Sequence, residues 1–337
     1  MPDLLNTIDL APYLEGTASS AEMQHLARAL VDNAARIGFF YVKGWESVVP
    51  KALVDSVFAY NERFFDLPLE IKDSLAYTSS KANRGYLSFG REQASLSTQV
   101  TLNGGAEGEP SEEPIEIERD QKETMEIGND IDPDYPEHWP KEEDLPGFRE
   151  TMNRFHLACH DLHLRIMSLL AVSLDLPEDY FVPDISTRSH CLRLLHYPPT
   201  KRSEGNSRIG AHTDFGTVTL LWQDATGGLE VTGPDGQWAP VHPKPDTFVI
   251  NIGDILARWS NDKLKSTVHR AVLPDPSTDD PKTGLTRTRR SVAYFCNPDP
   301  TAMIECIRGL EGTCGPKYAP ILAGDYYAQA LEAEIGV

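Results

Sequence analysis

The stretch that decides the fold begins Cys191-Leu192-Arg193-Leu194-Leu195-His196-Tyr197 and ends Arg290-Ser291-Val292-Ala293-Tyr294-Phe295-Cys296. From one segment to the other, short runs of β-favouring residues alternate with turns that contain Gly and Pro. Eight runs are expected to be strands: Cys191–Tyr197, Ile209–His212, Val218–Gln223, Leu229–Thr232, Trp238–Val241, Thr247–Ile252, Ser266–Leu273 and Arg290–Cys296. Eight short strands with such turns are typical of a double-sheet jelly roll, so we predict a mainly β core of this kind.

Helices are expected to flank this core. Ser19 stands three residues before Glu22, which is a capping-box pattern, and apolar residues then recur at helical spacing as far as Gly38. The run Phe39–Val42 that follows is expected to be a strand, and a second helix is expected over about 51–65. A third helix over about 146–173 has a single apolar stripe, and at 1.5 Å per residue it would be about 40 Å long. It is long enough to back a whole sheet.

Two segments look different from the rest. Residues 101–145 are rich in Glu, Asp and Pro, and their composition indicates a solvated surface segment. Residues 274–288 are too polar for the core and are expected to loop out. We therefore expect one folding unit in three parts: an N-terminal buttress of helices and a strand at 1–100, the acidic segment at 101–145, and the long helix with the β core at 146–337.

Composition excludes several classes of protein. The 337 residues include 31 Lys plus Arg and 51 Asp plus Glu, so the formal net charge is −20. Such an acidic chain would repel nucleic acids and anionic lipid headgroups. Five cysteines without CxxC spacing fit a reducing compartment, and no apolar run approaches the length of a membrane span. We expect a cytoplasmic protein that acts on a small molecule, and the sequence predicts no oligomeric state.

The candidate chemistry begins with a metal motif, because the motifs GxGxxG, GxxxxGK[ST], GxSxG and HExxH do not occur. His212 and Asp214 are two residues apart in an extended segment, so their side chains point to the same face. His269 lies in a separate strand-like segment. Two histidines and one carboxylate form the facial triad of non-heme Fe(II) oxygenases, which leaves coordination positions open for other ligands.

A second pattern lies near the end of the β region. Arg289 and Ser291 are again two residues apart on an expected strand, so both could bind one carboxylate through charge-assisted hydrogen bonds. A cluster formed by Arg287, Arg289 and Arg290 is unusual in so acidic a chain, and it would offset the repulsion of a dianion.

These residues resemble the signature of the 2-oxoglutarate- and Fe(II)-dependent dioxygenases, in the branch that includes isopenicillin N synthase. The likeness extends over nearly the whole chain. Its stretches are Ile8-Asp9-Leu10, Gly38-Phe39-Phe40-Tyr41, Leu192–Pro198 with its Tyr-Pro end, and Asn251-Ile252-Gly253-Asp254. The resemblance implies a double-stranded β-helix in which His212, Asp214 and His269 hold Fe(II).

The resemblance also implies the co-substrates and the reaction. Arg289, Ser291 and Tyr197 would hold the distal carboxylate of 2-oxoglutarate, and dioxygen would be the oxidant. The expected reaction is oxidation, most simply hydroxylation, of a C–H bond in a small organic molecule, with release of succinate and CO2. Desaturation, ring expansion and cyclisation are alternative outcomes that these residues do not separate.

Within the branch the chain resembles fungal thymine 7-hydroxylases and related fungal natural-product oxygenases. The matching stretches are 82–86, 90–92, 122–128, 138–140, 192–197, 257–262 and 294–298, and they favour an active-site lid for the acidic segment. The residues that the resemblance suggests for the substrate pocket are Arg193, His190, Phe295, Phe215 and Trp222. His190 replaces an expected amide and Phe215 an expected tyrosine, so a pyrimidine edge would be recognised less well than in the thymine enzymes. A secondary-metabolite intermediate is therefore the preferred substrate class, and thymine-type hydroxylation is the alternative.

Three other interpretations stay open. A non-catalytic small-molecule binding protein could use the same scaffold, although it would not need three metal ligands. A cupin-like metalloenzyme without a keto acid would leave Arg289 and Ser291 unexplained. His156, His160 and His163 share one face of the long helix and could bind zinc there.

Overall fold

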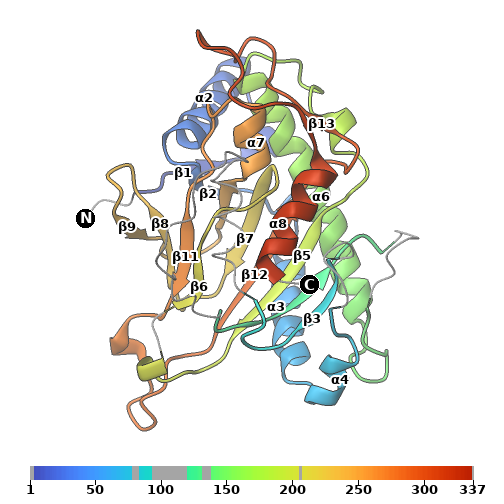
Figure 1. Ribbon diagram of the computed structural model, residues 1–337, viewed down its shortest axis with the longest axis vertical. Helices are drawn as coiled ribbons and strands as arrows, with labels where there is room; N and C mark the ends of the chain where they lie inside the picture. Colours follow the sequence, from blue (N-terminus) through green and yellow to red (C-terminus); the bar gives the residue numbers. More distant parts are fainter. Residues whose placement is uncertain (1–3, 78–82, 93–119, 131–137, 205–206, 336–337) are drawn as a thin grey trace.

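The computed structural model describes residues 4–77, 83–92, 120–130, 138–204 and 207–335, and most of its strands belong to two facing sheets (Figure 1). The larger sheet has eight strands in the order β1-β2-β10-β7-β12-β5-β4-β3, and the smaller has four in the order β6-β11-β8-β9. The strands of the larger sheet are β1 Thr7–Asp9, β2 Phe39–Lys43, β10 Phe248–Ile252, β7 Val218–Gln223, β12 Arg289–Cys296, β5 Cys191–Tyr197, β4 Glu123–Ile127 and β3 Gly85–Leu87. The strands of the smaller sheet are β6 Ser207–His212, β11 His269–Val272, β8 Leu229–Thr232 and β9 Trp238–Pro240. A separate pair joins β13 Met303–Ile304 to β14 Ile321–Leu322.

The helices lie around the larger sheet. They are α1 Ala11–Leu14, α2 Ser20–Arg36, α3 Lys51–Phe65, α4 Leu69–Asp73, α6 Phe148–Ser173, α7 Asp254–Trp259 and α8 Ala323–Ile335, with short 3₁₀ turns at Val182–Asp184, Arg202–Glu204 and Pro276–Thr278. The predicted capping box is confirmed, because Ser19 caps α2 and exchanges hydrogen bonds with Glu22. The predicted long helix is also confirmed as α6, which begins two residues later than expected, after Gly147.

The predicted jelly-roll core is confirmed. Each of the eight expected strands corresponds to one strand from β5 to β12, with bounds that differ by at most three residues. The parallel pair β1–β2 extends the larger sheet at one end, and β4 with β3 extends it at the other. Segments at 1–130 therefore contribute strands to the sheet as well as helices around it.

The acidic segment was expected to be a solvated lid, and part of it is not. Residues 123–127 form β4, an inner strand that is buried throughout its length. Its carboxylates are buried because they have distant partners: Glu123 pairs with Lys72 at 3.0 Å and with His196 at 2.7 Å, and Glu126 pairs with Arg193. The lid expectation for residues 101–119 and 131–137 lies outside the described residues.

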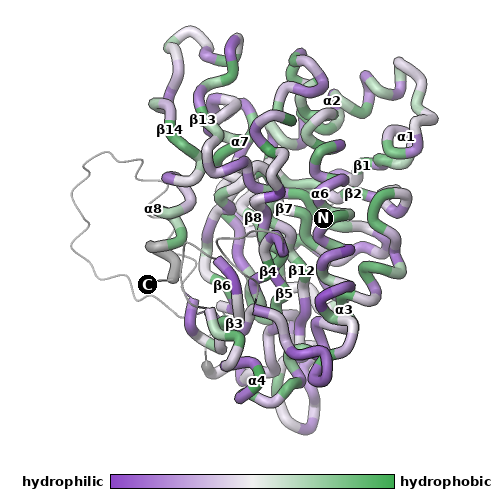
Figure 2. The backbone as a smooth tube through the Cα atoms, turned by 90° about the vertical axis from the view of Figure 1, so that its right-hand side faces the viewer, coloured by the Kyte–Doolittle hydropathy of each residue, from purple (hydrophilic) through white to green (hydrophobic). Residues whose placement is uncertain are grey.

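The larger sheet has two chemically different faces. On β7, Leu220 and Trp222 belong to the main hydrophobic cluster with Phe155 of α6, whereas Thr219 and Leu221 point into the space between the two sheets. The same alternation separates the inward and outward residues of β5 and β12. Hydrophobic residues gather where the helices meet the outer face (Figure 2). The inner face is therefore left for a site.

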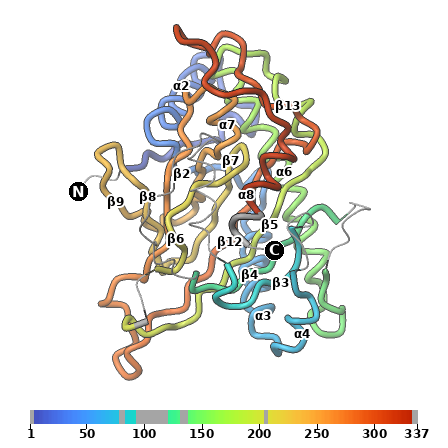
Figure 3. The backbone as a smooth tube through the Cα atoms, viewed as in Figure 1, coloured from blue at the N-terminus to red at the C-terminus, as the bar shows by residue number. Residues whose placement is uncertain are grey.

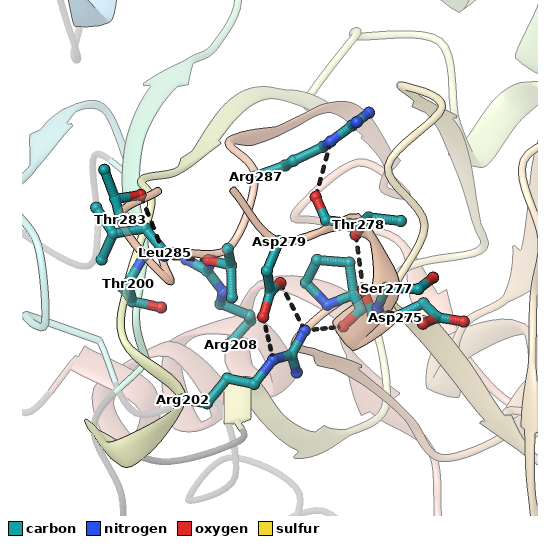
Figure 4. A network of polar contacts seen from close by, with 12 residues as sticks. Thr200, Arg202, Arg208, Asp275, Ser277, Thr278, Asp279, Thr283, Leu285 and Arg287 are labelled. Atoms are coloured by element: carbon teal, nitrogen blue, oxygen red, sulfur yellow. Dashed lines mark hydrogen bonds and ion pairs between the residues drawn. The ribbon is translucent and has the colours of Figure 1, made fainter. Parts of the chain in front are cut away.

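The segment between β11 and β12 loops out, as predicted, at one end of the molecule (Figure 3). Its base is fixed by two arginines that Figure 4 shows. Arg202 binds Asp279 through two hydrogen bonds of 2.6 and 2.8 Å, and Arg208 donates to the hydroxyl of Thr286 at 2.8 Å. Burial lowers the pKa of Arg208 to about 10, although the residue keeps its charge at neutral pH. These contacts fix the loop just before Arg289, the first residue of β12.

Among the described residues, no helix combines the length and the apolar composition that a bilayer crossing requires.

Candidate metal centre and pocket

Two strands of the smaller sheet and the loop after one of them bring three candidate metal ligands together. His212 ends β6 and His269 begins β11, and these two residues face each other in the antiparallel pairing. The Nε2 atoms of His212 and His269 lie 3.7 and 3.6 Å from Oδ1 of Asp214. All three ligand atoms lie within 4.8 Å of one another, so a single ion could contact all of them.

The tautomer of each histidine suits a metal ligand. The Nδ1 atom of His212 lies 2.8 Å from the carbonyl oxygen of Gly210, and that of His269 lies 3.1 Å from the carbonyl oxygen of Thr267. A carbonyl can only accept, so each Nδ1 carries the proton and each Nε2 keeps its lone pair. Burial lowers the pKa of His212 well below its ordinary value, which keeps the ring in the neutral form that binds metals.

The carboxylate of Asp214 is oriented by two buried donors. Thr219 donates to Oδ2 at 2.5 Å and Asn251 donates to the same oxygen at 2.6 Å, so Oδ1 is left to face the histidines. Burial alone would raise the pKa of Asp214, but the nearby histidines and these two hydrogen bonds hold it below its ordinary value. The group is therefore an anion at neutral pH.

The loop that carries Asp214 is fixed to the first turn of α7. The backbone N–H groups of Asp254 and Ile255 donate to the carbonyl oxygens of Asp214 and Phe215, at 2.8 and 3.0 Å. Gly253 allows this approach, because a Cβ atom there would lie 2.3 Å from the carbonyl oxygen of Gly216. Helix N–H groups that usually need a cap thus stabilise the loop that carries Asp214.

A second set of inward side chains comes from β12 and β5. Arg289 and Ser291 are fully buried on β12, and the Nη1 atom of Arg289 lies 3.4 Å from Oγ of Ser291. The guanidinium carbon lies 4.6 Å from the ring centroid of Tyr197, which pairs with Arg289 across the two strands. Gln223 of β7 accepts a hydrogen bond from Nη2 at 3.3 Å.

This set fits a carboxylate ligand. The Nε atom of Arg289 is buried and has no hydrogen-bond partner among the described residues. Burying a guanidinium N–H without a hydrogen-bond acceptor costs free energy, so a bound acceptor would stabilise this position. A carboxylate accepts two hydrogen bonds from one guanidinium group, and a keto acid that also binds the metal would supply it.

Both sets open into one cavity between the sheets. Arg193 of β5 and Phe295 of β12 line the same cavity, and the guanidinium carbon of Arg193 lies 5.1 Å from the ring centroid of Phe295. Arg193 is also paired with two carboxylates, at 2.7 Å from Glu126 and 3.4 Å from Glu92. The candidate metal ligands therefore lie at one end of the cavity, and Arg193 and Phe295 lie at another.

The structure does not bring three of the expected substrate residues into this cavity. Trp222 lies on the outer face of β7, where its ring packs 4.7 Å from Phe248, because its neighbours Thr219 and Leu221 take the inward positions. His190 stands three residues before the inward-facing Arg193, and residues three apart on a strand point to opposite faces. His190 precedes the first residue of β5, and its ring centroid lies 5.2 Å from that of His160 and 5.0 Å from that of His163, both on α6, so the expectation for Trp222 and His190 is corrected. Phe215 is half-buried and does not line the cavity.

Three residues of the site were not predicted. Thr219 and Asn251 orient Asp214, and Gln223 contacts Arg289. Their contacts depend on the pairing of β7 with β10 and β12, which joins residues far apart in the sequence. One feature of the sequence indicates a role for Asn251. It is a polar residue within the apolar run Phe248–Ile252, so it needs a buried hydrogen-bond partner.

The histidines of α6 form a separate cluster on the outer face of the sheet. The structure brings His160 and His163 near His190, whereas His156 contacts the hydroxyl of Tyr294. The backbone N–H of Asn297 donates to Nδ1 of His190, so its Nε2 carries the proton and donates to Nδ1 of His160 at 3.0 Å. His190 in this tautomer has no lone pair toward its neighbours. The cluster is therefore built as a hydrogen-bonded chain rather than as the zinc site considered above.

These buried histidines predict a pH dependence of stability. Burial lowers the pKa of His156 to about 4 and that of His163 to about 3, whereas both titrate near 6.5 when unfolded. The unfolded chain therefore binds more protons below pH 6.5, and each histidine costs about 1.4 kcal/mol per pH unit as the pH falls toward its folded pKa. His156→Phe should reduce the slope of unfolding free energy against pH by about that amount between pH 6 and 4.5, as measured by denaturant titration. An unchanged slope would show that the protonation of His156 is not coupled to unfolding.

Comparison with known proteins agrees with the geometry. Residues 188–298 match the 2OG-Fe(II) oxygenase superfamily model, and residues 5–142 match the model of the N-terminal region of non-haem dioxygenases in morphine synthesis. The chain is 39% identical to the proline hydroxylase buaE of Petromyces alliaceus, over 90% of each chain. It is 35% identical to the 2-oxoglutarate-Fe(II) type oxidoreductase ppzD of Metarhizium majus, over 97% of this chain and 94% of the relative.

A solved structure extends the likeness to three dimensions. The full-length Neurospora crassa T7H in complex with alpha-ketoglutarate, which is 2-oxoglutarate, and thymine superposes with a TM-score of 0.83. The two sequences are 36% identical, over 98% of this chain and 96% of the other. Matches of this extent, together with the geometry of the cavity, show that the chain belongs to the 2OG-Fe(II) oxygenase superfamily and is a dioxygenase that depends on Fe(II) and 2-oxoglutarate.

Proposed function

We propose that His212, Asp214 and His269 are the residues that bind Fe(II) in this chain. The convergence of one buried carboxylate and two Nε2 atoms supports this assignment, because this ligand set is the facial triad of Fe(II) oxygenases. The backbone carbonyls of Gly210 and Thr267 hold the two rings in the required tautomer.

The same proposal gives the distal carboxylate of 2-oxoglutarate to Arg289, Ser291 and Tyr197. The unpaired Nε of Arg289 supports it, and the burial of all three residues would make the charge-assisted hydrogen bonds strong. When bound, iron and 2-oxoglutarate together supply the oxidation of the substrate by dioxygen, with release of succinate and CO2. The chain orients the substrate, and the apolar residues of the cavity exclude water.

The substrate end of the cavity favours a molecule with an oxygen-bearing edge. Among the described residues that line the cavity, Arg193, Arg270 and Arg289 are cationic, and Asp214 is the one carboxylate. Arg270 is paired with Glu230 at 2.8 Å and Arg193 with Glu126 at 2.7 Å, and of these two Arg193 is the one whose guanidinium lies beside Phe295, an aromatic ring that lines the cavity. An arginine only donates, so the substrate would present a carbonyl or carboxylate oxygen to it and pack its body on the ring.

We infer that the reaction is hydroxylation of a small secondary-metabolite intermediate of this kind. The proline hydroxylase among the relatives supports it, because an amino acid has one carboxylate edge and a compact apolar body. Thymine is the second candidate, because the Neurospora T7H was solved with thymine. Neither His190 nor Phe215 lines the cavity, so the positions expected to read the pyrimidine edge supply no polar contact there.

A substrate panel tests this proposal. The protein would be incubated in air with Fe(II), 2-oxoglutarate and free amino acids including proline, small aromatic acids or thymine, and succinate and products would be measured by mass spectrometry. We expect succinate to form in step with a product one oxygen atom heavier, from a compound other than thymine. Oxidation of thymine alone would establish the pyrimidine alternative, and a product two hydrogen atoms lighter would contradict hydroxylation.

We also propose that the protein works in the cytoplasm. The five cysteines are all free thiols in the structure, which agrees with a reducing compartment.

A further inference from the structure

The strand that carries His212 is irregular next to that residue. In the pairing of β6 with β11, His212 faces His269 and Ile209 faces Ala271, so Gly210 and Ala211 together face the single residue Arg270. Such a bulge interrupts the ladder of hydrogen bonds and turns the side chain that follows it. The strand β6 is also the edge of its sheet, so this backbone needs partners from outside the sheet.

The partner for Gly210 is a buried aspartate on a different part of the chain. Oδ1 of Asp120 accepts the backbone N–H of Gly210 at 3.0 Å, and the carbonyl oxygen of Gly210 accepts Nδ1–H of His212 at 2.8 Å. The next residue, Gln121, adds a backbone hydrogen bond to the carbonyl oxygen of Arg208 at 3.0 Å. Asp120 is therefore two hydrogen bonds away from the imidazole that we assign to iron.

Asp120 is itself held by a chain of buried charges. It is 1% exposed, and its Oδ2 lies 3.4 Å from Nζ of Lys122, which also pairs with Glu92. Glu92 in turn lies 3.4 Å from Nη1 of Arg193 at the substrate end of the cavity. The backbone N–H of Asp120 donates to the carbonyl oxygen of Glu92 at 3.1 Å, which fixes its main chain as well. Among the described residues, Lys122 is an ionic partner of Oδ2 of Asp120, and Oδ1 accepts the hydrogen bond from Gly210.

We propose that Asp120 is a positioning residue for the iron centre, because it holds the bulge of β6 and thereby the ring of His212. This inference rests on the proposed role of His212 as an iron ligand. The alternative is that Asp120 merely neutralises Lys122 and stabilises the fold. The two differ in what matters at position 120: positioning needs a hydrogen-bond acceptor that reaches Gly210, whereas neutralisation needs the negative charge.

Two substitutions separate these roles. Asp120→Asn removes the charge and keeps an acceptor oxygen, and Asp120→Ala removes both. Anaerobic Fe(II) titration in the presence of 2-oxoglutarate, read by the visible metal-to-ligand charge-transfer band, gives the iron affinity of each protein. We expect Asp120→Ala to weaken Fe(II) binding about tenfold, at the low end of the effect of groups that orient metal ligands, because Asp120 acts through Gly210. Asp120→Asn is expected to stay within about threefold of the wild type, because an acceptor remains.

The controls make each outcome decisive. Gln121→Ala is the matched control, because its contact with β6 uses the backbone, and it should leave Fe(II) affinity unchanged. Asp120→Ser keeps a polar group beside Lys122 but is shorter, and it replaces Asp120→Ala if that variant does not fold. The inference would be overturned if Asp120→Ala or Asp120→Ser bound Fe(II) as tightly as the wild type. It would also be overturned if Asp120→Asn and Asp120→Ala lost Fe(II) affinity equally. A wild-type protein without the band would instead contradict the proposed iron and 2-oxoglutarate site.

Discussion

Replacing Asp214 by alanine is expected to abolish turnover. The substitution removes the one carboxylate of the proposed iron ligand set, and it leaves two neutral imidazoles that bind a dication weakly. Because a metal ion contributes several kcal/mol to catalysis, the loss should be about 10³-fold or more. Succinate formation, measured with saturating 2-oxoglutarate and the best compound of the substrate panel, would report it.

A control variant tests whether the loss of turnover is specific to Asp214. Asp235 is an exposed aspartate in the turn between β8 and β9, and Asp235→Ala removes the same charge away from the cavity. Its turnover should equal that of the wild type. If Asp214→Ala still turned over at a comparable rate, the proposed ligand set would be wrong.

Replacing Arg289 by alanine is expected to act on 2-oxoglutarate rather than on the substrate. A hydrogen bond to a charged group contributes about 1.5–3 kcal/mol, so the KM for 2-oxoglutarate should rise about 10- to 100-fold. The KM for the substrate should change little, because Arg193 and Phe295 lie at the other end of the cavity. Steady-state kinetics with each compound varied in turn would separate the two constants.

The neighbouring residue provides the comparison. Arg290 is adjacent on β12 but points away from the cavity, with its Nη2 atom 3.9 Å from Glu62. Arg290→Ala removes an equal charge from the opposite face of the sheet, and it should leave both KM values unchanged. A rise in the KM for 2-oxoglutarate that is as large in Arg290→Ala as in Arg289→Ala would point to net charge rather than to a specific contact.

The parts of the site that could be predicted are those that follow from the period of a strand. Arg289 and Ser291 are two residues apart on β12, so their common direction is a local property of the strand. His212 is the last residue of β6 and Asp214 lies in the loop that follows, so the spacing identified this pair, whereas the contacts of the loop with α7 place it. The same rule could have separated His190 from Arg193, because three residues place side chains on opposite faces.

Other features depend on contacts between distant segments. Whether Trp222 or its neighbours face the cavity is decided by how β7 pairs with β10 and β12, and no local pattern contains that register. The strand β4 contains two glutamates, so it resembles a solvated segment until its partners Lys72 and Arg193 are brought beside it by the fold. Burial of a polar strand is therefore invisible to hydrophobic periodicity.

The position of Asp120 also depends on contacts between segments that are distant in the sequence. In sequence it lies within an acidic stretch, and nothing there distinguishes it from its neighbours. In the structure it lies beside the edge of β6, because the segment before β4 spans from the larger sheet to the smaller one. Residues of both sheets and of the segment just before β4 therefore support the cavity.

One cavity is proposed to hold an iron ion and a keto acid together, and an anaerobic titration can detect both. The metal-free protein would receive Fe(II) and then 2-oxoglutarate while the visible spectrum is recorded. We expect a charge-transfer band that saturates at one equivalent of each and that is lost in Asp214→Ala and weakened in Arg289→Ala. Binding of iron without that band would show that the keto acid does not reach the metal, and the proposed joint site would be wrong.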